Sequence, residues 1–216
     1  MMQTGLDLRD LRISHNGVQV AALNTVIASG QVLVVMGPSG SGKSSLLAAI
    51  IGSPPAGFAV SGQIVLNGRD ITGLPPARRN IGIMFQDDLL FPHLSVAQNL
   101  GFGLTARAGT RAQRRTLIDQ ALSDAGLAGF GPRDPASLSG GQRARVALMR
   151  TLLAAPQALL LDEPFSKLDF ALRDQIREFV LTRARNLGLP VILVTHDAND
   201  AAAAGGRIVF PDGSAP

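Results

Sequence analysis

A glycine-rich segment between an apolar run and a helical pattern constrains this chain more than any other feature of its sequence. Residues 37–44 read GPSGSGKS and fit the pattern GxxxxGK(S/T). They follow the run VLVVM and precede KSSLLAAII, which places them at a strand-to-helix turn. Glycine lets backbone N–H groups approach an anion, and the helix N-terminus adds the positive end of its dipole. The segment therefore predicts a phosphate-binding loop in a fold of alternating strands and helices.

Two side chains of this loop are expected to act on a nucleoside triphosphate. Lys43 can reach the β- and γ-phosphates, and the Ser44 hydroxyl can ligate Mg²⁺. The chain has 20 basic residues but only two lysines, and a compact ammonium suits a phosphate site better than a guanidinium. The expected cofactors are ATP and Mg²⁺. The predicted contacts in the loop are Gly37, Pro38, Ser39, Gly40, Ser41, Gly42, Lys43, Ser44 and Ser45.

A second motif supplies two carboxylates. The run LLLDEP at residues 159–164 is an apolar strand that ends in Asp162 and Glu163. Strand ends in parallel sheets face the ligand crevice, so Asp162 is expected to hold the Mg²⁺ shell. Glu163 is expected to polarise the attacking water as the general base. Alone this pair would read as a solvated turn, but beside the phosphate loop it predicts ATP hydrolysis.

The order of apolar and helical patterns predicts an α/β fold with a mostly parallel sheet. Core strands are expected at 32–36, 81–85, 158–162 and 191–195, and helices at 43–51, 140–154 and 170–187. Residues 5–29 and 60–70 read as extended pieces of an N-terminal antiparallel side sheet. Residues 87–156 carry few strand signals. They are predicted to form a helical lobe inserted in a core of 1–86 and 157–216, all within one domain of residues 1–216.

The composition argues against several other classes of protein. The net charge is only +4, the arginines are scattered, and Trp and Tyr are absent, so nucleic acid is not an expected partner. The absence of Cys excludes disulfides and thiolate chemistry. No apolar run approaches the ~18–20 residues of a membrane helix, and the first residues carry no apolar signal segment. The chain is therefore expected to stay in the cytosol.

The segment LSGGQ at residues 138–142 precedes a further helical pattern, RARVALMRTLL. Its serine hydroxyl, glycine N–H groups and helix N-terminus make a second anion site, although an ordinary serine-capped helix would look the same. Together with the phosphate loop, this segment makes the chain resemble the nucleotide-binding subunit of ABC transporters. The resemblance covers nearly the whole chain and implies a P-loop NTPase core.

The resemblance also gives roles to single residues. Gln86, after the run IGIMF, falls at the Q-loop position, where it would touch Mg²⁺ and report to a membrane partner. Asp169 in SKLD resembles the D-loop residue, and His196 in VTHD resembles the switch histidine, which steadies the γ-phosphate and the attacking water. In the family two subunits pack head to tail, with each ATP between one subunit's phosphate loop and the other's signature. The signature contacts implied here are Ser139, Gly140, Gly141 and Gln142.

The same resemblance implies several partners. They are a second copy or a homologous subunit, transmembrane permease subunits and a substrate-binding protein. The chain would then lie on the inner face of the cell membrane, held there through the permease. Residues 85–96, FQDDLLFPHLSV, look like those of bacterial importers of molybdate, thiamine, iron or polyamines. An exporter or lipoprotein-release ATPase, or a soluble non-transport ABC ATPase, stays an alternative.

One departure from the family concerns the base of the nucleotide. Family members usually stack an aromatic residue on adenine near position 15, where this chain reads ISHNG with no Tyr, Trp or Phe. His15, Val18 or Val20 is expected to contact the base instead. A second expectation concerns the permease, which should dock near residues 87–100. Leu89, Leu90 and Phe91 are the predicted surface contacts.

Overall fold

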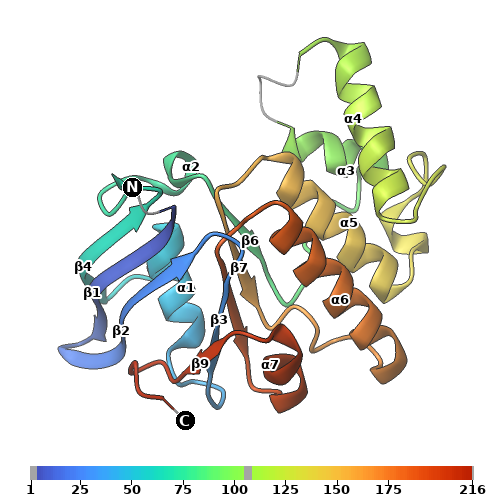
Figure 1. The fold of residues 1–216 in the computed structure, drawn as a ribbon. Coiled ribbons are helices and arrows are strands. Elements are labelled where there is room, and N and C mark those ends of the chain that lie inside the picture. The colour runs from blue at the N-terminus through green and yellow to red at the C-terminus, as the bar shows by residue number, and fades with distance from the viewer. Residues whose placement is uncertain (1–3, 105–108, 216) are drawn as a thin grey trace. The chain divides into compact units, whose positions relative to one another are not determined.

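The computed structural model describes residues 4–104 and 109–215, with residues 170 and 171 described by their backbone alone (Figure 1). The chain divides into two compact units. The first comprises Met1–Ile83, Gln157–Glu163 and Leu181–Pro216, and the second comprises Met84–Pro156 and Pro164–Val180. Within the described ranges, no helix is both long and apolar enough to cross a lipid bilayer.

An antiparallel sheet forms one layer of the first unit. Its strand order is β2 (Val18–Ala28), β1 (Gly5–His15), β4 (Phe58–Leu66) and β5 (Arg69–Asp70). The side chains of Leu6, Leu8, Leu11 and Ile13 are fully buried, so β1 turns its apolar face to the core. The predicted N-terminal antiparallel side sheet is confirmed.

A five-stranded sheet forms the second layer, with its strands in the order β6, β7, β8, β3 and β9. The pairs β3–β8, β3–β9 and β7–β8 are parallel. The central strands are buried on both faces, which explains their continuous apolar runs. The bounds are β6 Ile81–Met84, β7 Ala158–Asp162, β8 Val191–Thr195, β3 Val32–Met36 and β9 Arg207–Val209. The four predicted core strands are present, β6 is one residue shorter than predicted, and β9 was not predicted.

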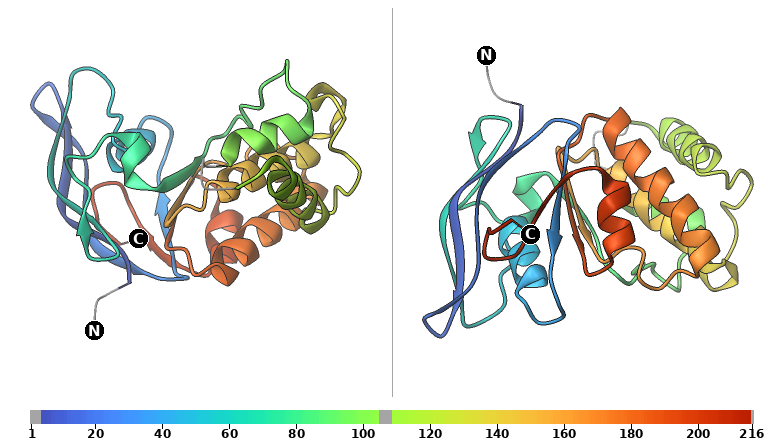
Figure 2. Two further views of the ribbon diagram at one scale, coloured as in Figure 1. Left: turned by 90° about the horizontal axis from the view of Figure 1, so that it is seen from above. Right: turned by 60° about the horizontal axis from the view of Figure 1, so that its bottom comes forward.

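Helix α1 (Lys43–Ile51) lies between the two sheets (Figure 2, right). Its Leu46, Leu47 and Ile50 share one buried cluster with residues of β1, β3, β7 and β8. The short helices α2 (Pro76–Arg79) and α7 (Ala198–Ala204) complete this unit. The sandwich holds the loop before α1 rigidly, because its flanking strand and helix are both anchored in the same core.

The second unit is helical and contains α3 (Val96–Gly103), α4 (Arg111–Asp124), a 3-10 turn η2 (Pro135–Ser137) and α5 (Gly140–Leu153). Helix α6 (Phe170–Asn186) begins in this unit and ends in the first. The buried core of the second unit includes Leu100, Leu122, Val146 and Met149. The unit takes in Pro164–Val180, a segment that the sequence analysis placed with the core.

Several of the described helices begin with a side chain that caps them. Ser95, Thr110 and Ser139 each accept a hydrogen bond from a first-turn N–H and form a capping box at the start of α3, α4 and α5. Asp197 accepts from two N–H groups at the start of α7. These helices therefore satisfy part of their N-terminal donors internally.

Candidate functional site

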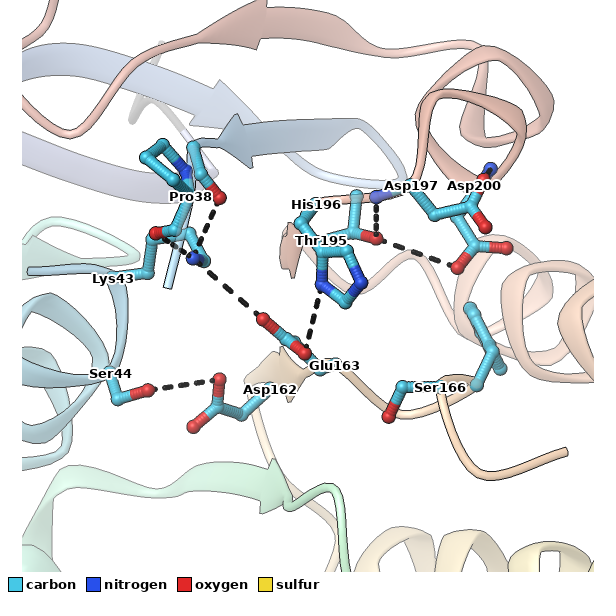
Figure 3. A network of polar contacts seen from close by, with 12 residues as sticks. Pro38, Lys43, Ser44, Asp162, Glu163, Ser166, Thr195, His196, Asp197 and Asp200 are labelled. Carbon is cyan, nitrogen blue, oxygen red and sulfur yellow. Dashed lines mark hydrogen bonds and ion pairs between the residues drawn. The ribbon is translucent and has the colours of Figure 1, made fainter. Parts of the chain in front are cut away.

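The carboxyl ends of three neighbouring strands bring the predicted catalytic residues of the first unit together. In the sheet Met36 lies opposite Thr195, and Asp162 lies opposite Val194. The phosphate loop, Glu163 and His196 directly follow these positions, so they emerge at one edge of the sheet (Figure 3). This edge is where parallel α/β sheets bind ligands.

The phosphate loop ends at Gly42, the N-cap of α1. Gly42 has φ 92°, in the left-handed region, and a Cβ added there would lie 2.5 Å from the backbone oxygen of Val20. Only glycine fits this position without strain. Because glycine carries no side chain, α1 differs from α3, α4, α5 and α7, which begin with a capping side chain. Its first-turn N–H groups have no side-chain acceptor from the N-cap and can bind an anion.

Lys43 is held over the loop that precedes it. Its side chain is 5% exposed, and its Nζ donates hydrogen bonds of 2.8 Å to the backbone oxygens of both Gly37 and Pro38. The same Nζ lies 3.7 Å from Oε1 of Glu163. In the part of the chain that the structure describes, the buried hydroxyl of Ser41 has no hydrogen-bond partner. The loop thus presents an ammonium and a hydroxyl beside the amides of α1, which fits a phosphate chain.

Ser44 and Asp162 form a second pair at this edge. The Ser44 hydroxyl donates to Oδ1 of Asp162 across 3.3 Å. Burial raises the pKa of the Asp162 carboxyl, the nearby Glu163 raises it further, and the Ser44 hydrogen bond and Lys43 oppose the rise. Two oxygens about 3 Å apart can be neighbouring ligands of an octahedral Mg²⁺, whose bonds are about 2.1 Å long. The residues present therefore fit the predicted metal.

Glu163 lies between two basic side chains. Its Oε1 faces Lys43, and its Oε2 lies 3.1 Å from Nδ1 of His196. Its backbone has φ 46°, a left-handed conformation unusual for glutamate, and its N–H donates to the oxygen of Val194 at 3.0 Å. The Glu163 side chain is 17% exposed, whereas that of His196 is 54% exposed. A carboxylate fixed in this way can accept a proton from a water molecule in front of it.

Thr195 fixes the turn that carries His196 through contacts with two aspartates. Asp197 is the N-cap of α7, and Asp200 lies in the first turn of that helix. The Thr195 hydroxyl accepts from the N–H of Asp197 at 3.0 Å and lies 3.5 Å from Oδ2 of Asp200. Thr195 and Asp200 are both buried, at 2% and 3% exposure. His196 is therefore presented by a turn with little freedom.

The other predicted nucleotide contacts belong to the second unit. Ser139 caps α5, because its hydroxyl accepts from the N–H of Gln142 at 3.3 Å while its own N–H donates to Oε1 of Gln142 at 3.0 Å. Gly141 packs against α6, where an added Cβ would lie 2.4 Å from Cδ2 of Leu172. Asp169 accepts a 2.9 Å hydrogen bond from the N–H of Leu172 at the start of α6.

Gln86 is exposed and lines a cavity of about 430 Å³ in the second unit. The cavity wall continues through Asp87, Asp88 and Leu89. Of the predicted permease contacts, Leu89 is 56% exposed, but Leu90 packs against the core of the unit. Leu90 is partly buried and also lines the cavity, so the expectation that it is a surface residue holds only in part. Phe102 is a surface candidate that the sequence analysis missed. It is 69% exposed, and its ring centroid lies 4.6 Å from that of Phe91 with the two planes tilted by 58°.

A second missed residue lies beside His15. The imidazole of His15 stacks on the ring of Phe58, with centroids 4.6 Å apart and planes 22° from parallel. The two residues are directly opposite in the β1–β4 register. Val18 is 67% exposed, whereas Val20 packs against the core. Position 15 thus carries an aromatic pair, although the segment ISHNG contains no Tyr, Trp or Phe.

Comparison with known proteins identifies the family. The family model described as ABC transporter matches residues 20–166. The chain belongs to the ABC transporter family. An "Uncharacterized ABC transporter ATP-binding protein YnjD" of Escherichia coli K12 is 51% identical over 84% of this chain and 83% of its own length. The solved structure of cbiO1 from Clostridium perfringens, part of the ABC transporter complex cbiONQ, superposes with a TM-score of 0.82 at 28% identity, over 96% of this chain and 84% of that one.

A further relative is the "Sulfate/thiosulfate import ATP-binding protein CysA" of Mycobacterium bovis. It is 43% identical over 85% of this chain, and the chain spans 51% of that protein's length. Membership of the family confirms the α/β fold with a P-loop NTPase core and makes the chain an ATP-binding subunit with ATPase activity. The resemblance inferred from LSGGQ and the phosphate loop was correct.

Proposed function

We propose that this chain hydrolyses ATP to drive a membrane importer of a solute. The observation that carries the proposal is the convergence of Lys43, Glu163 and His196 on one edge of the sheet, in front of the open N-terminus of α1. The identity to a protein named for sulfate and thiosulfate import supports the import direction. An exporter would use the same catalytic residues, so this direction rests on the relatives and on residues 85–96.

The proposed mechanism assigns one role to each side chain. Lys43 leaves the oxygens of Gly37 and Pro38 to bind the β- and γ-phosphates, while Ser44 and Asp162 hold Mg²⁺. Mg²⁺, when bound, neutralises the charge that develops on the phosphate oxygens. Glu163 takes a proton from the attacking water. His196 keeps the Glu163 carboxylate in orientation. In this proposal His196 also steadies the γ-phosphate and the attacking water.

The second unit supplies the remaining contacts in this proposal. Two copies of the chain, or one copy and a homologous subunit, pack head to tail, and Ser139–Gln142 of one copy contact the ATP held by the other. Asp169 lines the same nucleotide, and Gln86 contacts Mg²⁺ and responds to the permease. The two units act as lobes of a single ATPase domain. The remaining partners are permease subunits and a substrate-binding protein, and the chain lies on the cytoplasmic face of the membrane.

The variant Glu163→Gln tests the proposal. It keeps the size of the side chain and removes its basicity, so turnover should fall by about 10²–10⁴-fold while ATP binding is kept. With ATP and Mg²⁺ the variant should accumulate as a dimer, measured by size exclusion with light scattering. Glu178→Gln is the matched control, because Glu178 is the chain's other glutamate and is exposed on α6. Near-normal hydrolysis by Glu163→Gln would contradict the assignment of the base.

A further inference from the structure

Two adjacent carboxylates directly after Gln86 pair with cations from two other segments of the second unit. Asp87 pairs with the ammonium of Lys167, in the loop before α6. Asp88 pairs with the guanidinium of Arg143, in the first turn of α5, where Nε lies 3.4 Å from Oδ2. The two partners lie close to Asp169 and to Ser139 in the sequence. The loop after Gln86 therefore contacts both segments that carry predicted nucleotide contacts in this unit.

Arg143 also contacts the backbone just before the N-terminus of α5. Its Nη1 donates a 2.7 Å hydrogen bond to the backbone oxygen of Leu138, the residue just before Ser139. One guanidinium thus links the carboxylate of Asp88 to the turn that starts α5. A planar group with several donors can hold two acceptors in a fixed relation, which a lysine ammonium does less well.

The same face of α5 holds the loop at another point, two turns further along. Arg150 donates to the backbone oxygens of Asp88 at 3.0 Å and Leu89 at 2.7 Å. Leu89 has φ 45°, a conformation that a side-chain-bearing residue adopts only when its surroundings hold it there. Loop and helix are therefore tied through the backbone as well as through the ion pair, so a shift of one moves the other.

Burial distinguishes this link from an ordinary surface ion pair. The side chain of Asp88 is 25% exposed and that of Arg143 is 40% exposed, whereas the pair Arg115–Asp119 on α4 is 85% and 66% exposed. Burial raises the pKa of Asp88, and Arg143 opposes that rise. Fully exposed ion pairs contribute little to stability on average. The partial burial of Asp88 and Arg143 separates their pair from that class.

From these contacts we infer that Arg143 is a positioning residue, which together with Asp88 sets the turn at Leu138–Ser139 for contact with the nucleotide of a second copy. The inference rests on the proposed function, in which Ser139–Gln142 bind the partner's ATP. Arg143 itself contacts no nucleotide. Through it, the conformation of the loop after Gln86 sets how well the signature segment closes on the partner's ATP.

The test uses the full chain in the Glu163→Gln background, with two separate measurements. ATP binding to the monomer is followed at low protein concentration with a fluorescent ATP analogue. ATP-dependent dimerisation is followed by size exclusion with light scattering over a range of protein concentrations. Adding Arg143→Ala should leave monomer binding unchanged within about twofold and weaken dimerisation by about tenfold or more, as expected for coupled sites. Arg143→Lys should retain part of the dimerisation.

Three further variants make the outcome specific. Asp88→Asn, close to isosteric, should weaken dimerisation in the same direction, and combining it with Arg143→Ala should add little, because the two residues share one contact. Asp119→Asn breaks the exposed pair with Arg115 and should dimerise like the parent. If Arg143→Ala dimerises as well as the parent, the inference is overturned. If the Glu163→Gln parent itself fails to dimerise with ATP, the proposed ATP site between two copies of the chain is contradicted, and so is the inference that rests on it.

Discussion

The contact between α5 and α6 gives a prediction whose size can be worked out from distances. A methyl group added at Gly141 would lie 2.4, 2.8 and 2.9 Å from Cδ2, Cγ and Cδ1 of Leu172. Carbon atoms pack best at about 3.5–4.0 Å, so the helices would have to separate by roughly 1 Å. Overpacking of this kind costs about 1–3 kcal/mol. For a chain of this length each kcal/mol lowers Tm by roughly 2–4 °C, so Gly141→Ala should melt about 2–12 °C lower.

Thermal unfolding followed by circular dichroism without nucleotide measures this effect. Gly140→Ala is the matched control, because a Cβ there would meet Leu168 at 3.7 Å and Arg143 at 3.9 Å, which are ordinary contacts. Its Tm should equal or exceed that of the wild type, since alanine favours a helix over glycine. Leu172→Ala removes the clashing atoms, so the double variant with Gly141→Ala should lose less stability than the two single losses added. A Tm of Gly141→Ala within a degree of the wild type would refute this account.

The remaining predictions concern the metal, the permease and the base. Burial raises the pKa of Asp162 above its unfolded value. Ionisation of this carboxyl therefore lowers the stability of the folded chain as pH rises from the unfolded pKa to the raised one, and the full loss is present above both. Without nucleotide, Asp162→Asn should therefore have a higher Tm than the wild type at pH 7, and the difference should shrink on acidification. The variant should also lose the stabilisation by Mg²⁺ and ATP. A lower Tm than that of the wild type at pH 7 would contradict this prediction. Leu89→Ser with Phe102→Ser should release the chain from membranes containing its permease, whereas Leu187→Ser, equally exposed, should not; continued co-sedimentation of the double variant would place the docking site elsewhere. Without a tyrosine or tryptophan at position 15, stacking on His15 should favour neither base, so ATP and GTP should compete within about tenfold, and a larger preference would show that another residue reads the base.

The elements next to the phosphate loop could be predicted almost residue for residue. Strands β3, β7 and β8 are buried on both faces, so each reads as an unbroken apolar run that stops where the chain leaves the sheet. The bounds of α1 follow from a glycine at each end, Gly42 and Gly52, both in the left-handed conformation. In these places the local sequence and the tertiary packing specify the same structure.

The features that escaped prediction depend on residues distant in the sequence. Phe58 meets His15 through the register of β1 and β4, which no local pattern encodes. Strand β9 has three residues of mixed burial and exists because β3 offers an edge to pair with. Leu90 lies in a loop flanked by aspartates and a proline, which reads as surface, yet it packs on the helical core. Gln86 and Asp169 received their proposed roles from family resemblance.

The open N-terminus of α1 has a consequence for dynamics. A helix whose N-cap residue offers no side-chain acceptor opens more readily at that end, and its amide protons exchange with deuterium from the solvent during each opening. In α3, α4 and α5 a serine or threonine side chain caps this end. In α1 the phosphate oxygens of a bound nucleotide would accept hydrogen bonds from the first-turn N–H groups, so the nucleotide would act as the N-terminal cap of the helix. Each turnover would then remove and replace a piece of secondary structure, and the first turn of α1 would stiffen and loosen in step with the ATPase cycle.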